Sequence, residues 1–107
     1  MALFPFSTKQ LDTLTAVGVT TAVRLKTNQV TFQVTTTGIG TDAVLRFEGS
    51  LDNTYFFNLA STEADTTISA DGTTGYSVSD LPLQYVRVRL VSFTGGTPSV
   101  TTKVGGL

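Results

Sequence analysis

Apolar and polar residues alternate strictly along several segments of the chain. In residues 29–35 three apolar side chains alternate with Gln and Thr, and in residues 85–93 apolar side chains alternate with two arginines. A period of two is typical of a strand with one buried face. The apolar phase of such strands predicts four buried core residues, Phe32, Phe47, Val86 and Val88.

Further short strands follow from the same pattern and from the turn signals between them. The candidates are residues 23–26, 45–48, 55–59, 66–69, 75–78 and 100–104. Turns are indicated at residues 27–28, 38–42, 52–53, 71–72, 79–80 and 94–96, which are rich in Gly, Asn and Asp. This spacing predicts an all-β protein, a single small β-sandwich of jelly-roll or immunoglobulin-like type with about seven or eight short antiparallel strands.

The N-terminal stretch departs from this pattern. Leu11, Leu14 and Val17 recur at helical spacing among threonines that oppose a helix, so a short helical turn and an edge strand both fit. We divide the chain into an N-terminal arm, residues 1–15, and a β-sandwich domain, residues 16–107.

The start of this arm is strongly apolar. Leu3, Phe4 and Phe6 flank Pro5, which cannot donate a hydrogen bond to a central strand. Each apolar side chain left in water would forgo about 1.5–3 kcal/mol. We therefore predict that Ala2–Phe6 docks on a partner, with folding back onto its own domain as the alternative.

Composition narrows the possible functions. Hydrophobic residues make up 40% of the 107-residue chain, charged residues make up 14%, and the formal net charge is -1. No basic run that would suit nucleic acid or an anionic membrane is present. The first residues lack the features of a secretory signal, so we expect no export through a secretory route.

The commonest catalytic side chains are missing. The sequence contains no His, Cys or Trp, which removes the usual general base and the usual soft metal ligands. The carboxylates lie mainly in turn-like contexts and are interpreted as solvated or turn-capping groups: Asp42, Glu48, Asp52, Glu63, Asp65, Asp71 and Asp80. We therefore expect that the protein is not an enzyme and that it binds no cofactor and no small-molecule substrate. A calcium site built from Glu63, Asp65 and Asp71 is a minor alternative, because the spacing matches no EF-hand.

Two groups of residues are candidates for contact with a partner. Arg87 and Arg89 point away from the apolar face of their strand, where they either meet water or pair with carboxylates of another subunit. Tyr55, Phe56 and Phe57 are consecutive, so alternation cannot bury all three on one face of a sheet. At least one of these aromatic side chains is expected to face outward.

Two motifs resemble those of small β-sandwich modules from tailed-bacteriophage virions. A strand ending in G-S-x-D at residues 49–52 leads into an aromatic strand, and a later Y-V-R-V-R strand at residues 85–89 precedes a Gly-rich turn. The resemblance spans residues 30–104 and is to capsid decoration or cement proteins and head-fibre modules. It implies a homo-oligomer, often a homotrimer, that is synthesised in the host cytoplasm. On the virion it would occupy the outer capsid surface and bind the major capsid protein.

A second resemblance leads to a different function. Discoidin-like carbohydrate-binding domains are similar in the same two places, although here Asn53 replaces the usual Gly and no Trp is present. A carbohydrate-binding module and another head or tail adaptor of a phage are therefore the alternatives to a decoration protein.

Overall fold

The computed structural model describes residues 8–27, 29–59, 65–78 and 84–106. These residues form eight strands and no helix. The strands are β1 (Thr8–Gln10), β2 (Gly18–Val19), β3 (Val23–Arg24), β4 (Val30–Ser50), β5 (Phe57–Asn58), β6 (Thr66–Ile68), β7 (Gly72–Val78) and β8 (Tyr85–Gly105). Every pairing between them is antiparallel, which confirms the all-β, antiparallel prediction.

Two very long strands form the centre of the sheet. β4 and β8 contain 21 residues each and pair from Thr31↔Gly105 to Ser50↔Tyr85. The prediction that all strands are short is therefore wrong. The glycine-rich segments 38–42 and 94–96, which were expected to be turns between strands, lie inside β4 and β8.

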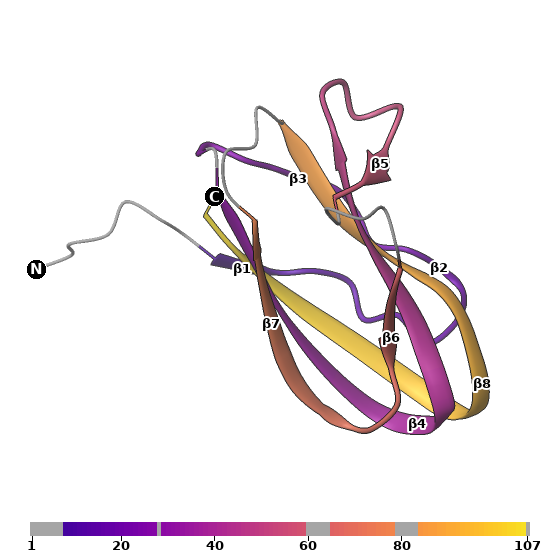
Figure 1. Cartoon of the computed structure of the whole chain (residues 1–107). Coiled ribbons are helices and arrows are strands. Elements are labelled where there is room, and N and C mark those ends of the chain that lie inside the picture. The colour runs from indigo at the N-terminus through magenta and orange to yellow at the C-terminus, as the bar shows by residue number, and fades with distance from the viewer. Residues whose placement is uncertain (1–7, 28, 60–64, 79–83, 107) are drawn as a thin grey trace, which may run out of the picture.

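These glycines bend the two strands instead of ending them. Gly38, Gly95 and Gly96 have φ values of 69°, 68° and 67°. This is the left-handed backbone conformation, which residues with a Cβ atom rarely adopt. A Cβ on Gly40 would overlap the backbone of Gly95, so the two strands approach too closely here for a larger residue. The register shifts on either side of Ile39, and such bulges increase local bending. Figure 1 shows both strands turning back on themselves at the lower end of the molecule.

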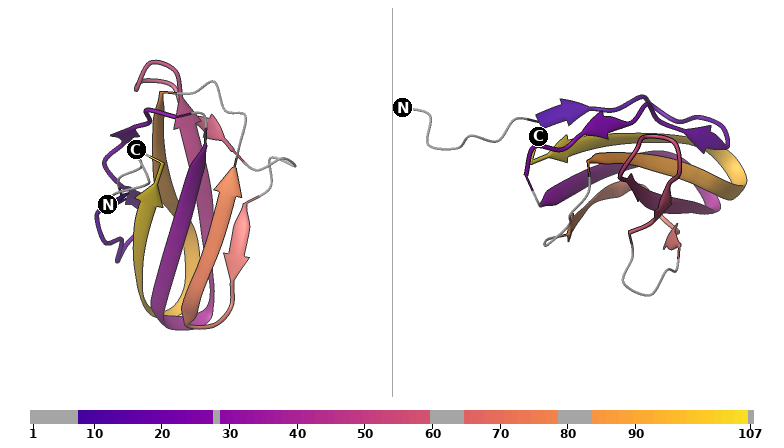
Figure 2. Two further views of the ribbon diagram at one scale, coloured as in Figure 1. Left: turned by 90° about the vertical axis from the view of Figure 1, so that its left-hand side faces the viewer. Right: turned by 90° about the horizontal axis from the view of Figure 1, so that it is seen from above.

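The short strands form two outer rows of the sheet, one on each side of the central pair of strands. β1, β2 and β3 pair along β8 from Thr8↔Gly105 to Arg24↔Tyr85. On the other side, β5, β6 and β7 pair along β4, ending at Val78↔Val30. The sheet therefore consists of four rows of strands. β8 and β4 are the two central rows, and the two outer rows follow them around the bend (Figure 2).

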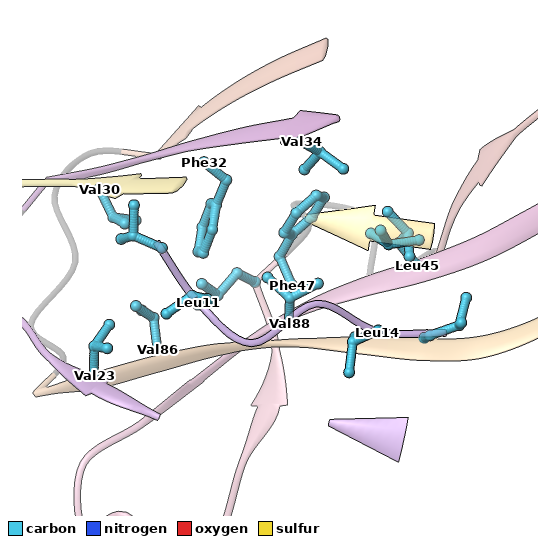
Figure 3. Packing of buried hydrophobic residues seen from close by; sticks show 14 of the residues in the cluster. Leu11, Leu14, Val23, Val30, Phe32, Val34, Leu45, Phe47, Val86 and Val88 are labelled. Carbon is cyan, nitrogen blue, oxygen red and sulfur yellow. The ribbon is translucent and has the colours of Figure 1, made fainter. Parts of the chain in front are cut away.

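The bend brings the two halves of the sheet face to face around one core. Phe32 lies in the first half of β4 and Phe47 in the second, yet their ring centroids are 4.8 Å apart. Figure 3 shows these rings among valines and leucines from both halves. All four predicted core residues are buried, which confirms the alternation. Because the eight strands belong to one curled sheet, the finer expectation of a jelly-roll or immunoglobulin-like sandwich stays a prediction.

Part of the expected N-terminal arm belongs to this sheet. The amide of Leu11 donates to the carbonyl of Thr102 at 2.8 Å, Leu14 forms a bridge with Val100, and both leucines are buried. Of the two alternatives for this stretch, the structure has edge pairing. The apolar segment Ala2–Phe6 lies outside the described residues.

The bend predicts a sharp contrast between two glycines. Gly40→Ala should lower the free energy of unfolding by about 1–3 kcal/mol, because the new methyl group must displace the backbone of β8. Gly18→Ala is the matched control, since its Cβ would find nothing closer than 3.9 Å. Chemical denaturation measures both changes. Equal stability of the two variants would contradict the bend as described.

The aromatic contact across the core predicts a second effect. Phe47 packs against both Phe32 and Tyr76, with each pair of ring centroids 4.8 Å apart. Phe47→Ala should therefore cost about 3–5 kcal/mol. A melting temperature within a degree or so of the parent would show that the face of this strand is misassigned.

Candidate partner-binding surface

A cluster of charged side chains covers the outer face of the second half of the sheet. Arg46 and Glu48 come from β4, and Arg87 and Arg89 come from the neighbouring stretch of β8. Arg46 is paired with Arg89 and Glu48 with Arg87 in the strand register. Since alternate residues of a strand share one face, all four lie opposite the apolar core.

Glu48 is the centre of this cluster. Its Oε1 accepts from Nε of Arg87 at 2.7 Å and its Oε2 from Nε of Arg89 at 3.1 Å. Only 3% of the residue is exposed. Because a buried carboxylate is costly without partners, these two charge-assisted hydrogen bonds are what permit its burial. They also connect the two central strands across the sheet.

Asp65 extends the cluster toward the outer row of strands beside β4. Nε and an Nη of Arg46 donate to its two carboxylate oxygens at 2.8 and 3.1 Å, and the side-chain amide of Asn58 donates at 3.2 Å. The Arg46 guanidinium lowers the pKa of Asp65 below its ordinary value, and Asp65 in turn raises the pKa of Arg46. We use the name charge cluster for Arg46, Glu48, Asp65, Arg87 and Arg89.

The loop between β4 and β5 is held rigidly at the end of the sheet opposite the bend. Asp52 accepts from the amides of Tyr55 and Thr54 at 3.0 and 2.9 Å, and these bonds lower its pKa. The buried hydroxyl of Ser50 accepts from the amides of Asp52 and Asn53 and donates to the Asp52 carboxylate. Asn53 has a φ of 60°, which Asn tolerates better than most residues. This geometry confirms the predicted turn at residues 52–53.

Three large apolar side chains project from this loop and the start of β5. Leu51, Tyr55 and Phe57 are 61%, 79% and 51% exposed, and we call them the apolar tip. Two of the three consecutive aromatic residues therefore face outward, as the alternation argument predicted. The third, Phe56, lies under the Arg87 guanidinium, with the Arg87 Cζ 3.7 Å from the ring centroid. This cation–π contact connects the segment that carries the apolar tip to the charge cluster.

The predicted partner-binding residues fall into two groups. Arg87 and Arg89 do meet a carboxylate, but it is Glu48 of the same chain. A role for their remaining N–H groups in binding a partner stays a prediction. Leu3, Phe4 and Phe6 lie outside the described residues.

Sequence reasoning missed the role of Glu48. The strand at residues 45–48 was predicted, but the Glu48 side chain was interpreted as solvated or turn-capping, and it is buried in β4. One signal was present in the sequence, because Arg46 and Glu48, and likewise Arg87 and Arg89, share a face through their spacing of two. The pairing of these two segments, however, could not be deduced from either segment alone.

The carboxylates considered for calcium have other partners. Asp65 binds Arg46, and Asp71 accepts from the amide of Ile39 at 2.9 Å at the bend. Glu63 lies outside the described residues. In the part of the chain that the structure describes, no group of three or more acidic side chains is placed to hold a metal ion.

Comparison with known proteins gives structural neighbours only. No protein-family model and no curated protein matches the chain. The crystal structure of the SPBc2 prophage-derived protein YomS superposes with a TM-score of 0.62 at 13% sequence identity and covers 98% of both chains. The chain shares the fold of a prophage-derived protein. A structure of Bacillus endospore appendages, a family of disulfide-linked pili, has a TM-score of 0.46 at 6% identity, over 94% of this chain and 85% of that one.

Among the residues that the structure describes, no helix is long and apolar enough to cross a membrane.

The charge cluster predicts a specific dependence of stability on pH. The lowered pKa of Asp65 means that its contribution is fully present above its ordinary pKa of 3.8 and is lost as the pH falls below that value. The melting temperature of Asp65→Asn should therefore lie below that of the parent by a constant amount near neutral pH. This difference should narrow in strong acid.

The matched variant for this test is Arg46→Met, which removes the cation that lowers the pKa of Asp65. Its melting temperature should converge with that of the parent over the same acidic range. A difference that stayed constant down to strong acid in both variants would contradict the assigned pair.

Proposed function

We propose that this chain is a non-enzymatic structural protein of a phage virion, most specifically a decoration or cement protein that binds the outer surface of the head as a homo-oligomer. The observation that carries the proposal is the fold shared with the prophage-derived YomS over 98% of both chains. The virion resemblance of the G-S-x-D and Y-V-R-V-R segments supports it independently of that superposition.

The apolar tip supports a role in binding a protein surface. Leu51, Tyr55 and Phe57 are exposed on a loop whose backbone is fixed by Ser50 and Asp52. A rigid loop loses little conformational entropy when it binds, and aromatic side chains are enriched in protein interfaces. The partner that we propose for this tip is the major capsid protein.

The non-enzymatic part of the proposal has support from the residues themselves. The sequence has no His and no Cys, and the carboxylates of Glu48, Asp52 and Asp65 all accept structural hydrogen bonds. These contacts account for the burial of Glu48 and for the orientation of all three groups without any reacting ligand.

A carbohydrate-binding module is the second candidate. The observation that favours it is Tyr55, a 79% exposed ring beside the polar residues Asp52 and Asn53 of the same turn. Sugar sites commonly use an exposed aromatic ring flanked by polar groups. In that case the chain would bind a glycan through Tyr55, and the other two residues of the apolar tip, Leu51 and Phe57, would make no contact with it.

Purified phage particles test the proposal. After induction of the cells that carry the gene, particles banded on a density gradient should contain the chain in many copies, measured by quantitative mass spectrometry. Its absence from the particles would overturn the virion role.

Tip variants then separate the two candidates. Tyr55→Ala with Phe57→Ala should abolish rebinding of purified protein to particles stripped of it, with an unchanged melting temperature. Val17→Ala is the control, because Val17 is 61% exposed, between the values of Phe57 and Tyr55, but lies outside the tip. Binding to a glycan array that requires Tyr55 but tolerates Phe57→Ala would favour the carbohydrate module instead.

A further inference from the structure

The most unusual exposed element of the fold is the edge strand β7. In the part of the chain that the structure describes, β7 pairs with β4 alone, from Thr36↔Gly72 to Val30↔Val78. Its other side therefore carries backbone N–H and C=O groups that no described strand pairs. Such an edge is a template for another strand.

Natural proteins protect their edges with short strands, charges, prolines or bulges. The other edge strands of this sheet are only two or three residues long: β1, β2, β3, β5 and β6. β7 contains seven residues, Gly-Thr-Thr-Gly-Tyr-Ser-Val, with no charge and no proline. Its pairing with β4 runs over seven consecutive residue pairs without a register shift. None of the usual protective features is present in this strand.

The outer face of β7 already forms hydroxyl pairs with its neighbour. Thr73 and Thr35 are joined through their Oγ1 atoms at 3.1 Å, and Ser77 and Thr31 through their hydroxyls at 3.0 Å. Between them lies Gly75, whose Cβ position has only ordinary contact, with the Phe32 carbonyl at 3.9 Å. The outer face of β7 thus carries small, uncharged residues.

We propose that β7 is an interface for a second copy of this chain, joined edge to edge in antiparallel β7–β7 pairing about a two-fold axis near Gly75. A closed pair is the commonest symmetry of homo-oligomers, and the same patch then serves both subunits. With the axis at Gly75, Thr73 lies opposite Ser77 of the partner subunit, so the hydroxyl pairing continues across the interface.

The absence of charge favours a second copy over other partners. Symmetry would place any charged residue of β7 near its own copy, which is destabilising, and β7 has none. Head-to-tail pairing of β7 with β1 is less favourable, because β1 offers three residues including Lys9 and would leave most of β7 unpaired. Self-pairing satisfies the whole strand.

The mass in solution tests this inference directly. The parent should be a dimer by light scattering, and Gly75→Lys should halve the mass while the chain stays folded by circular dichroism, since the site is open in the monomer. Gln10→Lys, on β1 at the opposite edge of the sheet, is the control and should stay dimeric. A monomeric parent, a trimer or a Gly75→Lys variant that stays dimeric would overturn the proposal. Loss of the dimer in Gln10→Lys would overturn it in favour of head-to-tail pairing.

A cross-link tests the register. The sequence has no Cys, so Gly75→Cys introduces a single thiol on the proposed axis, where opposed Cβ atoms lie within disulfide reach. Oxidation should give a covalent dimer. Gln33→Cys is the control. Gln33 pairs with Gly75 from the neighbouring strand β4, on the same outer face of the sheet, and this variant should not form a covalent dimer. The interface rests on the homo-oligomer of the proposed function, which a monomeric parent would also contradict, whereas the virion assignment is tested separately by the content of the particles.

Discussion

The close approach of two backbones at the bend is the constraint on which the rest of this fold depends. β4 and β8 can turn together only because glycines occupy the positions where they meet, with Gly38 and Gly40 on one strand and Gly95 and Gly96 on the other. Without the turn, the apolar faces of the two halves would point into water. With it, one sheet covers its own hydrophobic side, and Phe32 reaches Phe47 across the core.

The same turn decides what lies on the outside. Once the apolar phase is enclosed, the polar phase of each half becomes an outer face, and the two outer faces differ in character. The first half carries paired hydroxyls such as Thr35 with Thr73, and the second half carries the ion pairs of Glu48 with Arg87 and Arg89. The hydroxyl face ends at the uncharged edge of β7. The ionic face ends at a loop with exposed aromatic rings, so the molecule offers two chemically distinct contact regions.

The sequence alone could predict which side chains are buried but not how long the strands are. Alternation identified Phe32, Phe47, Val86 and Val88 correctly, because the period of a strand is a local property. The glycines at residues 38–40 and 95–96 were interpreted as turns, because glycine signals a turn and a bulged bend equally well. Their opposition across the sheet, Ile39 facing Gly96, is a long-range fact. The burial of Glu48 escaped prediction for the same reason, since its two arginines come from a distant segment.

The central pairing also has a consequence for the order in which the protein folds. Ser50 pairs with Tyr85 at one end of the β4–β8 ribbon and Thr31 with Gly105 at the other, so the stretch of chain to be closed roughly doubles from the first pair to the last. Closing the shorter loop costs less entropy, which favours nucleation beside the rigid turn at Asp52. Pairing would then propagate toward the bend. Because nearly all of this sheet joins residues that are remote in sequence, its folding should be slow for a chain of this size.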